Sequence, residues 1–152
     1  SPLPFRSSET TSILLAVNHQ LGFMWQRGND NWSSTTMSAS LILQMLREHR
    51  FESVLPLVSE TLRNAAAESP QRLGEVAREL VRWQGFFQNT DHAKAAEPYF
   101  RTVFTLLEEL AGPETPPTIA AAENLGGLLG SIDKLDEAIP LRERALAQMS
   151  NR

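Results

Sequence analysis

The chain has 152 residues, a formal net charge of −4 and 41% hydrophobic residues, which favour one folded domain or a short repeat array. It contains no cysteine, which excludes disulfides and thiolate metal sites, and no apolar run reaches the roughly 20 residues of a membrane span. Charges of both signs are mixed along the chain, whereas a nucleic-acid-binding protein clusters basic residues on one face, so we expect no nucleic-acid partner.

Residues 1–35 form an N-terminal region that does not follow the pattern of the rest. "SPLPFRSSETTS" is rich in proline, serine and threonine and predicts an extended arm. "ILLAVNHQLGFMW" is compatible with a short helix ending at Gly22 or with a strand, and "QRGNDNWSSTT" is a loop by composition. Phe23, Trp25 and Trp32 are large apolar residues in this arm. Either the arm folds back to cap the first repeat, which we favour because terminal repeats need a cap, or these residues dock on a partner.

Six helices are predicted after the arm by apolar periodicity and by turn residues. They run at about 36–49, 52–68, 71–90, 93–111, 116–131 and 135–149. Ser69-Pro70 is typical of an N-cap followed by proline at the first helical position. "GPETPPT", residues 112–118, ends one helix at Gly112 and starts the next. The expected fold class is therefore all-α.

An internal repeat shows in the spacing of three prolines. Pro56, Pro98 and Pro140 are 42 residues apart (98 − 56 and 140 − 98), and an apolar residue follows each. The same interval relates further positions of the unit, namely Leu41, Trp83 and Leu125; Met45, Phe87 and Leu129; Phe51, Ala93 and Leu135; and Val54, Ala96 and Ala138. Each unit predicts a helix, a short polar turn and a second helix, and units in tandem stack into an α-solenoid.

A proline within a helix removes a backbone hydrogen bond and crowds the preceding turn. We expect each of the three prolines to lie near the first turn of the second helix of its unit. Few amide donors have an intrahelical partner to lose at that point.

The third unit resembles the tetratricopeptide repeat, a family of helix–turn–helix repeats. "ENLGGLLGSIDKLDEAIPLRERAL" carries the family's Asn-Leu-Gly start at residues 124–126, its Glu-Ala at 137–138 and its Ala-Leu at 145–146. The Glu-Ala-x-Pro-Leu wording, the "GPETPPT" linker and the 42-residue period resemble the kinesin-light-chain-like subclass. In the turn, Asp91 and Asp133 stand where the family often has glycine, and aspartate tolerates such positions.

The other two units match the family less closely. The second matches in Ala96, Pro98 and Tyr99-Phe100, but it has Trp83-Gln84 where Leu-Gly is expected, and the first unit is the weakest. We interpret Trp83 and Phe87 as core residues rather than as a ligand pocket. The resemblance implies a right-handed α-solenoid of three repeats, at about 36–70, 71–112 and 113–152, preceded by the arm.

The resemblance also implies where a partner binds, because in this family the first helix of each pair lines a concave groove. Carried onto this chain, the groove positions are Leu43, Leu46, Arg47, Arg78, Val81, Gly85, Gln88, Asn89, Ala120, Glu123, Gly127, Gly130 and Ser131. The set is small, polar and mixed in charge. It lacks the paired Lys and Asn residues of members that bind a chaperone's C-terminal carboxylate, which argues against that role.

No constellation of catalytic or metal-binding residues is visible in the sequence. His19, His49 and His92 are scattered, and there is no metal-ligand spacing, phosphate-binding loop or nucleophile–base arrangement. We therefore expect no enzyme, no cofactor and no metal. The function expected is a protein–protein interaction module, an adaptor or accessory subunit that holds a peptide or helix in its groove.

Two alternatives stay open from the sequence. The chain begins with Ser1-Pro2, so it is either a processed mature protein or a fragment. A processed protein would be a structural subunit of a larger complex, in the cytoplasm or, after removal of a transit peptide, in a plastid or mitochondrion. A fragment would be the sensor or regulatory part of a larger signalling protein, and its 42-residue pattern would continue beyond Arg152.

Overall fold

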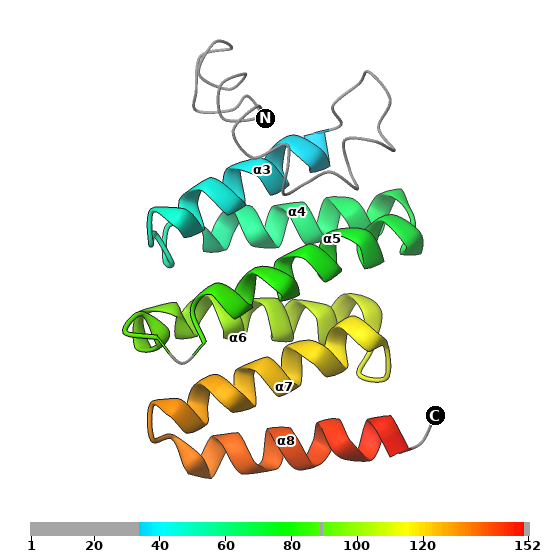
Figure 1. The fold of residues 1–152 in the computed structure, drawn as a ribbon. Helices are drawn as coiled ribbons and strands as arrows, with labels where there is room; N and C mark the ends of the chain where they lie inside the picture. Colours follow the sequence, from blue (N-terminus) through cyan, green and yellow to red (C-terminus); the bar gives the residue numbers. More distant parts are fainter. Residues whose placement is uncertain (1–33, 89, 151–152) are drawn as a thin grey trace.

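The computed structural model describes residues 34–88 and 90–150, and these residues form helices joined by short turns (Figure 1). The α-helices are α3 (Ser34–Arg47), α4 (Leu55–Glu68), α5 (Pro70–Trp83), α6 (Ala93–Ala111), α7 (Pro116–Ser131) and α8 (Leu135–Ser150). A 3₁₀ helix, η1 (Gln84–Phe86), follows α5 directly. The described part of the chain contains no strand, so the expectation of an all-α fold is confirmed for it.

The predicted helices agree with the observed ones except at two ends. Helix α4 begins at Leu55 rather than near residue 52, because residues 51–54 form a turn in which the Leu55 amide donates to the Glu52 carbonyl at 3.2 Å. Helix α5 ends at Trp83 rather than near residue 90. Beyond it the chain tightens into η1 around Gly85, a residue with low helix propensity.

Local sequence signals account for how several helices begin. The Ser69 hydroxyl accepts a hydrogen bond from the Arg72 amide at 2.9 Å, and Pro70 follows it at the first helical position. This is the predicted N-cap, which satisfies one of the amides left free at a helix start. Between α6 and α7, Gly112 adopts φ 88°, a left-handed conformation that glycine reaches without strain.

Two turns at the same register position share one backbone motif. His49 and Asp133, which lie 84 residues apart (133 − 49), both have positive φ, at 59° and 66°. In each case the next amide reaches back five residues: Arg50 donates to Met45 at 3.0 Å and Lys134 to Leu129 at 2.8 Å. This is the Schellman helix ending, usually made with glycine. Asp91, the third residue of the set, is not among the residues with positive φ.

The prediction for the prolines is right for one of the three. Pro56 lies in the first turn of α4. Pro98 and Pro140 lie inside α6 and α8, because those helices begin five residues earlier, at Ala93 and Leu135. Each therefore leaves the carbonyl four residues before it without its usual helical donor. The difference arises because residues 51–54 form a turn in the first unit but helix in the other two.

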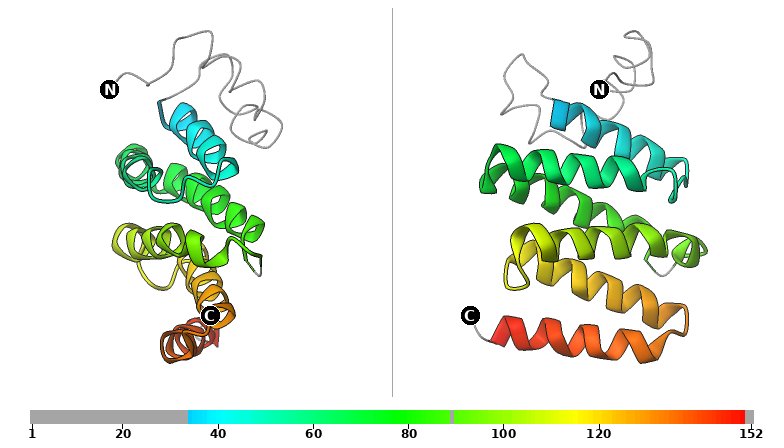
Figure 2. Two further views of the ribbon diagram at one scale, coloured as in Figure 1. Left: turned by 90° about the vertical axis from the view of Figure 1, so that its left-hand side faces the viewer. Right: turned by 180° about the vertical axis from the view of Figure 1, so that it is seen from behind.

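The helices stack in chain order, and each runs roughly antiparallel to the one before it (Figure 1). Consecutive helices pack on each other, and α4 also packs on α6 and α5 on α7. Figure 2 shows α4 and α6 on one side of the stack and α5 and α7 on the other. The first and second helices of successive pairs therefore form two separate surfaces.

The core runs along the middle of this stack and holds the aromatic residues of the second unit. Trp83, Tyr99 and Phe100 are fully buried, and Phe87 is nearly so, which confirms the interpretation of Trp83 and Phe87 as core residues. The Tyr99 hydroxyl donates to the Leu80 carbonyl at 2.5 Å, so its polar end has a partner inside the core.

Candidate partner-binding surface

The predicted groove positions of the first unit do not form an open surface. Leu43 and Leu46 are fully buried, so neither side chain is available to a partner, and their assignment to the groove is wrong. They lie in a run of α3 whose residues are buried on all sides of the helix. Arg47, the last residue of α3, is exposed.

The positions of the second and third units lie at the surface. Arg78, Glu123 and Ser131 are exposed, and Val81 and Gln88 are half-buried. Gly127 is also half-buried. The remaining predictions, Asn89 in the groove and Phe23, Trp25 and Trp32 in the arm, lie outside the described residues.

Side-chain contacts join α5 and α7 along this surface. The Asn124 amide donates to the Val81 carbonyl at 3.3 Å and to the Gln84 side-chain oxygen at 2.7 Å. The Gln88 amide occupies the space that a Cβ on Gly127 would take. Val81, Gln88 and Gly127 are thereby brought together, and we call the exposed surface of Arg78, Val81, Gln88, Glu123 and Gly127 the α5–α7 strip.

Glycines shape the surface in different ways. A Cβ on Gly126 would lie 2.7 Å from Cγ of Arg142 and 3.4 Å from the Ala138 carbonyl, so this glycine allows α8 to approach α7 closely. A Cβ on Gly130 or on Gly85 would meet no atom within 4 Å, so both glycines border open space. The strip is therefore bordered by backbone that a partner can approach.

Two exposed charges, Arg78 and Glu123, belong to the strip, and a buried carboxylate, Glu79, lies next to Arg78 in the sequence. Burial raises the pKa of Glu79, and the nearby guanidinium groups of Arg82 and Arg78 oppose that rise. Arg82 forms an ion pair with Glu79 at 2.6 Å. Arg78 and Glu123 form no ion pair or hydrogen bond with another side chain of the described chain. They are the strip's available charges.

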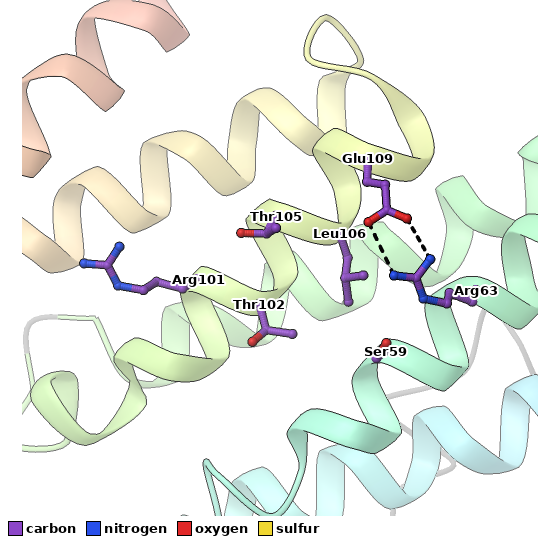
Figure 3. A pocket seen from close by; sticks show the side chains of 7 residues that line it. All are labelled: Ser59, Arg63, Arg101, Thr102, Thr105, Leu106 and Glu109. Atoms are coloured by element: carbon purple, nitrogen blue, oxygen red, sulfur yellow. Dashed lines mark hydrogen bonds and ion pairs between the residues drawn. The ribbon is translucent and has the colours of Figure 1, made fainter.

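On the opposite surface, formed by α4 and α6, several charges are paired with each other, although Glu60 and Lys94 form no ion pair within the described residues. Arg63 of α4 makes two contacts with the carboxylate of Glu109 of α6, at 2.7 and 3.3 Å (Figure 3). These two residues line a shallow hollow of about 330 Å³ together with Ser59, Arg101, Thr102, Thr105 and Leu106. The hollow is open and holds no cluster of catalytic groups.

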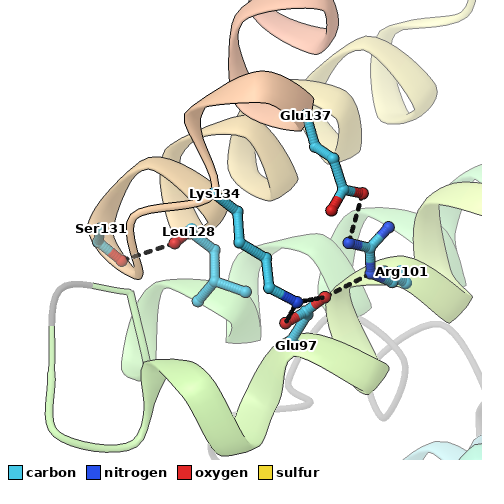
Figure 4. Close-up of polar contacts among 6 residues, drawn as sticks. All are labelled: Glu97, Arg101, Leu128, Ser131, Lys134 and Glu137. Atoms are coloured by element: carbon cyan, nitrogen blue, oxygen red, sulfur yellow. Dashed lines mark hydrogen bonds and ion pairs between the residues drawn. The ribbon is translucent and has the colours of Figure 1, made fainter.

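Ion pairs continue from α6 to α8 (Figure 4). Arg101 contacts Glu97 and Glu137 at 2.6 Å each, and Lys134 contacts Glu97 at 3.0 Å. Burial alone would raise the pKa of Glu97, but hydrogen bonds from Arg101 and Lys134 outweigh it and lower the pKa below its ordinary value. These ion pairs connect α6 with α8 and with the turn that precedes α8.

The sequence did not indicate that two residues of the α5–α7 junction, Asn124 and Gln84, contact each other. Asn124 stood out only as part of the Asn-Leu-Gly motif, although a polar residue on an apolar helix face signals a hydrogen bond to a neighbour. Gln84 replaces the expected glycine, and its partner could not be read from the sequence because it lies 40 residues away (124 − 84). Ser131 also proves to donate to the Leu128 carbonyl at 2.7 Å.

The described residues offer little for other kinds of site. They contain no group of three or more His, Cys, Asp or Glu placed to hold a metal ion. Within residues 34–88 and 90–150, no helix has the length and apolar character to cross a membrane. Comparisons of the chain with protein-family models, curated proteins and solved structures found no match.

Proposed function

We propose that the chain is a non-catalytic protein–protein interaction module, a right-handed α-solenoid of three tetratricopeptide-like repeats. Its sequence period, the antiparallel helix pairs, and the contacts of α4 with α6 and of α5 with α7 support this architecture. Each helix pair in such a solenoid buries its apolar side on its neighbours and leaves one continuous surface of first helices.

The observation that carries the proposed function is the combination, on the α5–α7 strip, of two exposed, unpaired charges of opposite sign with small residues. On the α4–α6 side, Arg63 and Glu109 satisfy each other. On the α5–α7 strip, Arg78 and Glu123 have no such partner in the described chain, and Gly130, further along α7, borders open space. Charged groups of both signs around small residues favour an extended peptide or a helix, whose polar side chains pair with them.

Charge reversal at the two free positions tests this function. The full-length chain would serve as bait in its native source, either as wild type or as the Arg78→Glu, Glu123→Lys variant. Both residues are exposed, so we expect the variant to fold normally and to retain at most about a tenth of the partner. A Thr105→Lys variant, on the opposite surface, is the matched control and should retain the wild-type amount.

Two results would overturn the proposal. One is that the wild-type bait retains no protein in stoichiometric amount. The other is that the charge-reversal variant retains its partners as well as the wild type does, because the α5–α7 strip would then not be the binding surface.

A further inference from the structure

The last helix carries an apolar stripe that is open to solvent. Leu135, Ile139, Leu146 and Met149 follow one another at intervals of four, seven and three residues, so they lie along one side of α8. Their exposed fractions are 55%, 53%, 59% and 40%. The alanines of α8 that lie against α7 are on another side of the helix and are buried. A row of large apolar side chains of this length indicates an interaction surface.

Within the same chain, the positions of the earlier units that correspond to three of the four stripe residues are covered by a helix, and those that correspond to Ile139 are half-buried. The residues 42 positions before Leu135, Leu146 and Met149 are Ala93, Phe104 and Leu107 in α6. Those 84 positions before are Phe51, in the turn that precedes α4, and Leu62 and Ala65 in α4. All six are buried. The helix that follows each in the chain packs against it, α5 against α4 and α7 against α6. Phe104, for example, borders one small cavity with Ile119 and Ala122 of α7.

We propose that the stripe of α8 is a docking face for an amphipathic helix of a protein partner, lying antiparallel to α8 as α7 lies to α6. The earlier units supply the geometry of this contact, and the stripe supplies its apolar part. The surface is separate from the α5–α7 strip, so it provides the module with a second partner site.

Charge defines the chemistry of the partner further. Asp136 follows Leu135 directly and Glu143 lies seven residues after Asp136, so both lie along one edge of the stripe. Both are exposed, and neither forms an ion pair with the described part of the chain. A docked helix with Lys or Arg along the facing edge would pair with them, as e and g positions do between coiled helices.

The same charges argue against a second copy of this chain as the occupant. Asp136 and Glu143 lie along one edge of the stripe. An antiparallel two-fold pair centred on the stripe would place this acidic edge of one copy beside that of the other. Like charges in such positions destabilise the pairing.

A labelled peptide can test the docking face directly. The probe is a synthetic peptide with the sequence of residues 69–84, which covers α5 and combines an apolar side with Arg72, Arg78 and Arg82. Its binding to the full-length chain would be followed by fluorescence anisotropy. The Ile139→Asp, Met149→Asp variant should bind it at least about tenfold more weakly than the wild type.

The control and the partner's charge are tested in the same assay. Asn64→Asp, Ala67→Asp puts two new charges on exposed positions of α4, away from α8, and should change the affinity less than about twofold. A peptide with its three arginines replaced by glutamate should bind at least about tenfold more weakly. Circular dichroism would verify that each variant folds.

Three outcomes would overturn the proposal. The wild-type chain could fail to bind the peptide, or the stripe variant could bind it as tightly as the wild type, which would place the contact elsewhere. Sedimentation equilibrium could instead reveal a dimer that the Ile139→Asp, Met149→Asp variant dissociates. That result would make a second copy the occupant.

Discussion

Helices α6 and α8 occupy the same place in consecutive units of the sequence, but within the described residues only α6 is covered by a helix that follows it. Phe104 of α6 is 8% exposed, whereas Leu146, which stands 42 residues later, is 59% exposed. Leu107 and Met149 differ in the same direction. The apolar pattern of a helix therefore predicts which of its sides can be buried against another element. Whether that side is buried depends on the presence of a neighbouring element.

The largest difference in stability is expected between substitutions at Phe104 and at Leu146. Phe104→Ala should lower the free energy of unfolding by about 3–5 kcal/mol, because it removes a buried aromatic side chain and leaves a cavity. Leu146→Ala should lower it by less than about 0.5 kcal/mol, because the leucine is mostly exposed. Urea unfolding of the two variants would measure the difference. Equal losses at both positions would contradict the described environment of α8.

A second substitution tests what the two helices share. Ala96 and Ala138 are register equivalents in α6 and α8, and both are buried. Ala138→Leu should overpack the contact with α7 and lower the free energy of unfolding by about 1–3 kcal/mol, and Ala96→Leu should do the same. Ala147→Leu, at an exposed position of α8, is the control. A melting temperature of Ala138→Leu equal to that of the wild type would count against the repeat alignment.

A smaller effect is expected where the two helices differ in chemistry. Tyr99 of α6 donates its hydroxyl to the Leu80 carbonyl, and the register position in α8 is Leu141, which has no polar group to donate. Tyr99→Phe leaves a buried carbonyl without this donor and should lower the free energy of unfolding by about 0.5–1.5 kcal/mol. Thermal unfolding would detect this change. An unchanged or higher stability would mean that the hydrogen bond contributes nothing.

The smallest effect concerns pH and the link between the two helices. The pKa of Glu97 is raised by burial but lowered further by Arg101 and Lys134, whereas an unfolded glutamate titrates near about 4.3. The carboxylate thus adds stability that is complete above that pH and is lost as pH falls through the lower folded pKa. Between about pH 5 and pH 3, the wild type should lose unfolding free energy more steeply than Glu97→Gln.

The control for this measurement lies at the register position in α8. Ile139→Glu places a carboxylate 42 residues after Glu97, at a site that is exposed in the described structure. Its pH dependence should follow that of the wild type. If Glu97→Gln and the wild type lost stability in parallel over the whole range, the ion pairs of Glu97 would have no part in the pH response.

Much of the helical organisation follows from the sequence because its signals are local. Ser69-Pro70 and Gly112 fix helix ends through side-chain capping and a left-handed backbone, which depend on few neighbours. The repeated positions predicted Trp83 and Phe87 in the core for the same reason, since apolar periodicity reports which side of a helix is buried.

The rest depended on contacts between distant residues or on small backbone choices. Leu43 and Leu46 were assigned to a groove because of their place in the repeat, but the whole circumference of that part of α3 is buried. The 3₁₀ turn at Gln84 and the positions of the two prolines inside α6 and α8 depend on the backbone conformation of the turn between the two helices of each unit. That conformation differs between units. The ion pair of Glu97 with Lys134 joins residues 37 apart in the sequence, so no local signal predicts it.

Hydrogen exchange on the native complex would test most directly the claim that this chain is an interaction module. The full-length chain would be measured alone and with the partner that co-purifies with it. We predict slower amide exchange in the complex at residues 78–88 and 120–131, which carry the α5–α7 strip, with little change along α4. No partner-dependent protection in those segments, or protection confined to the α4–α6 hollow, would contradict the account.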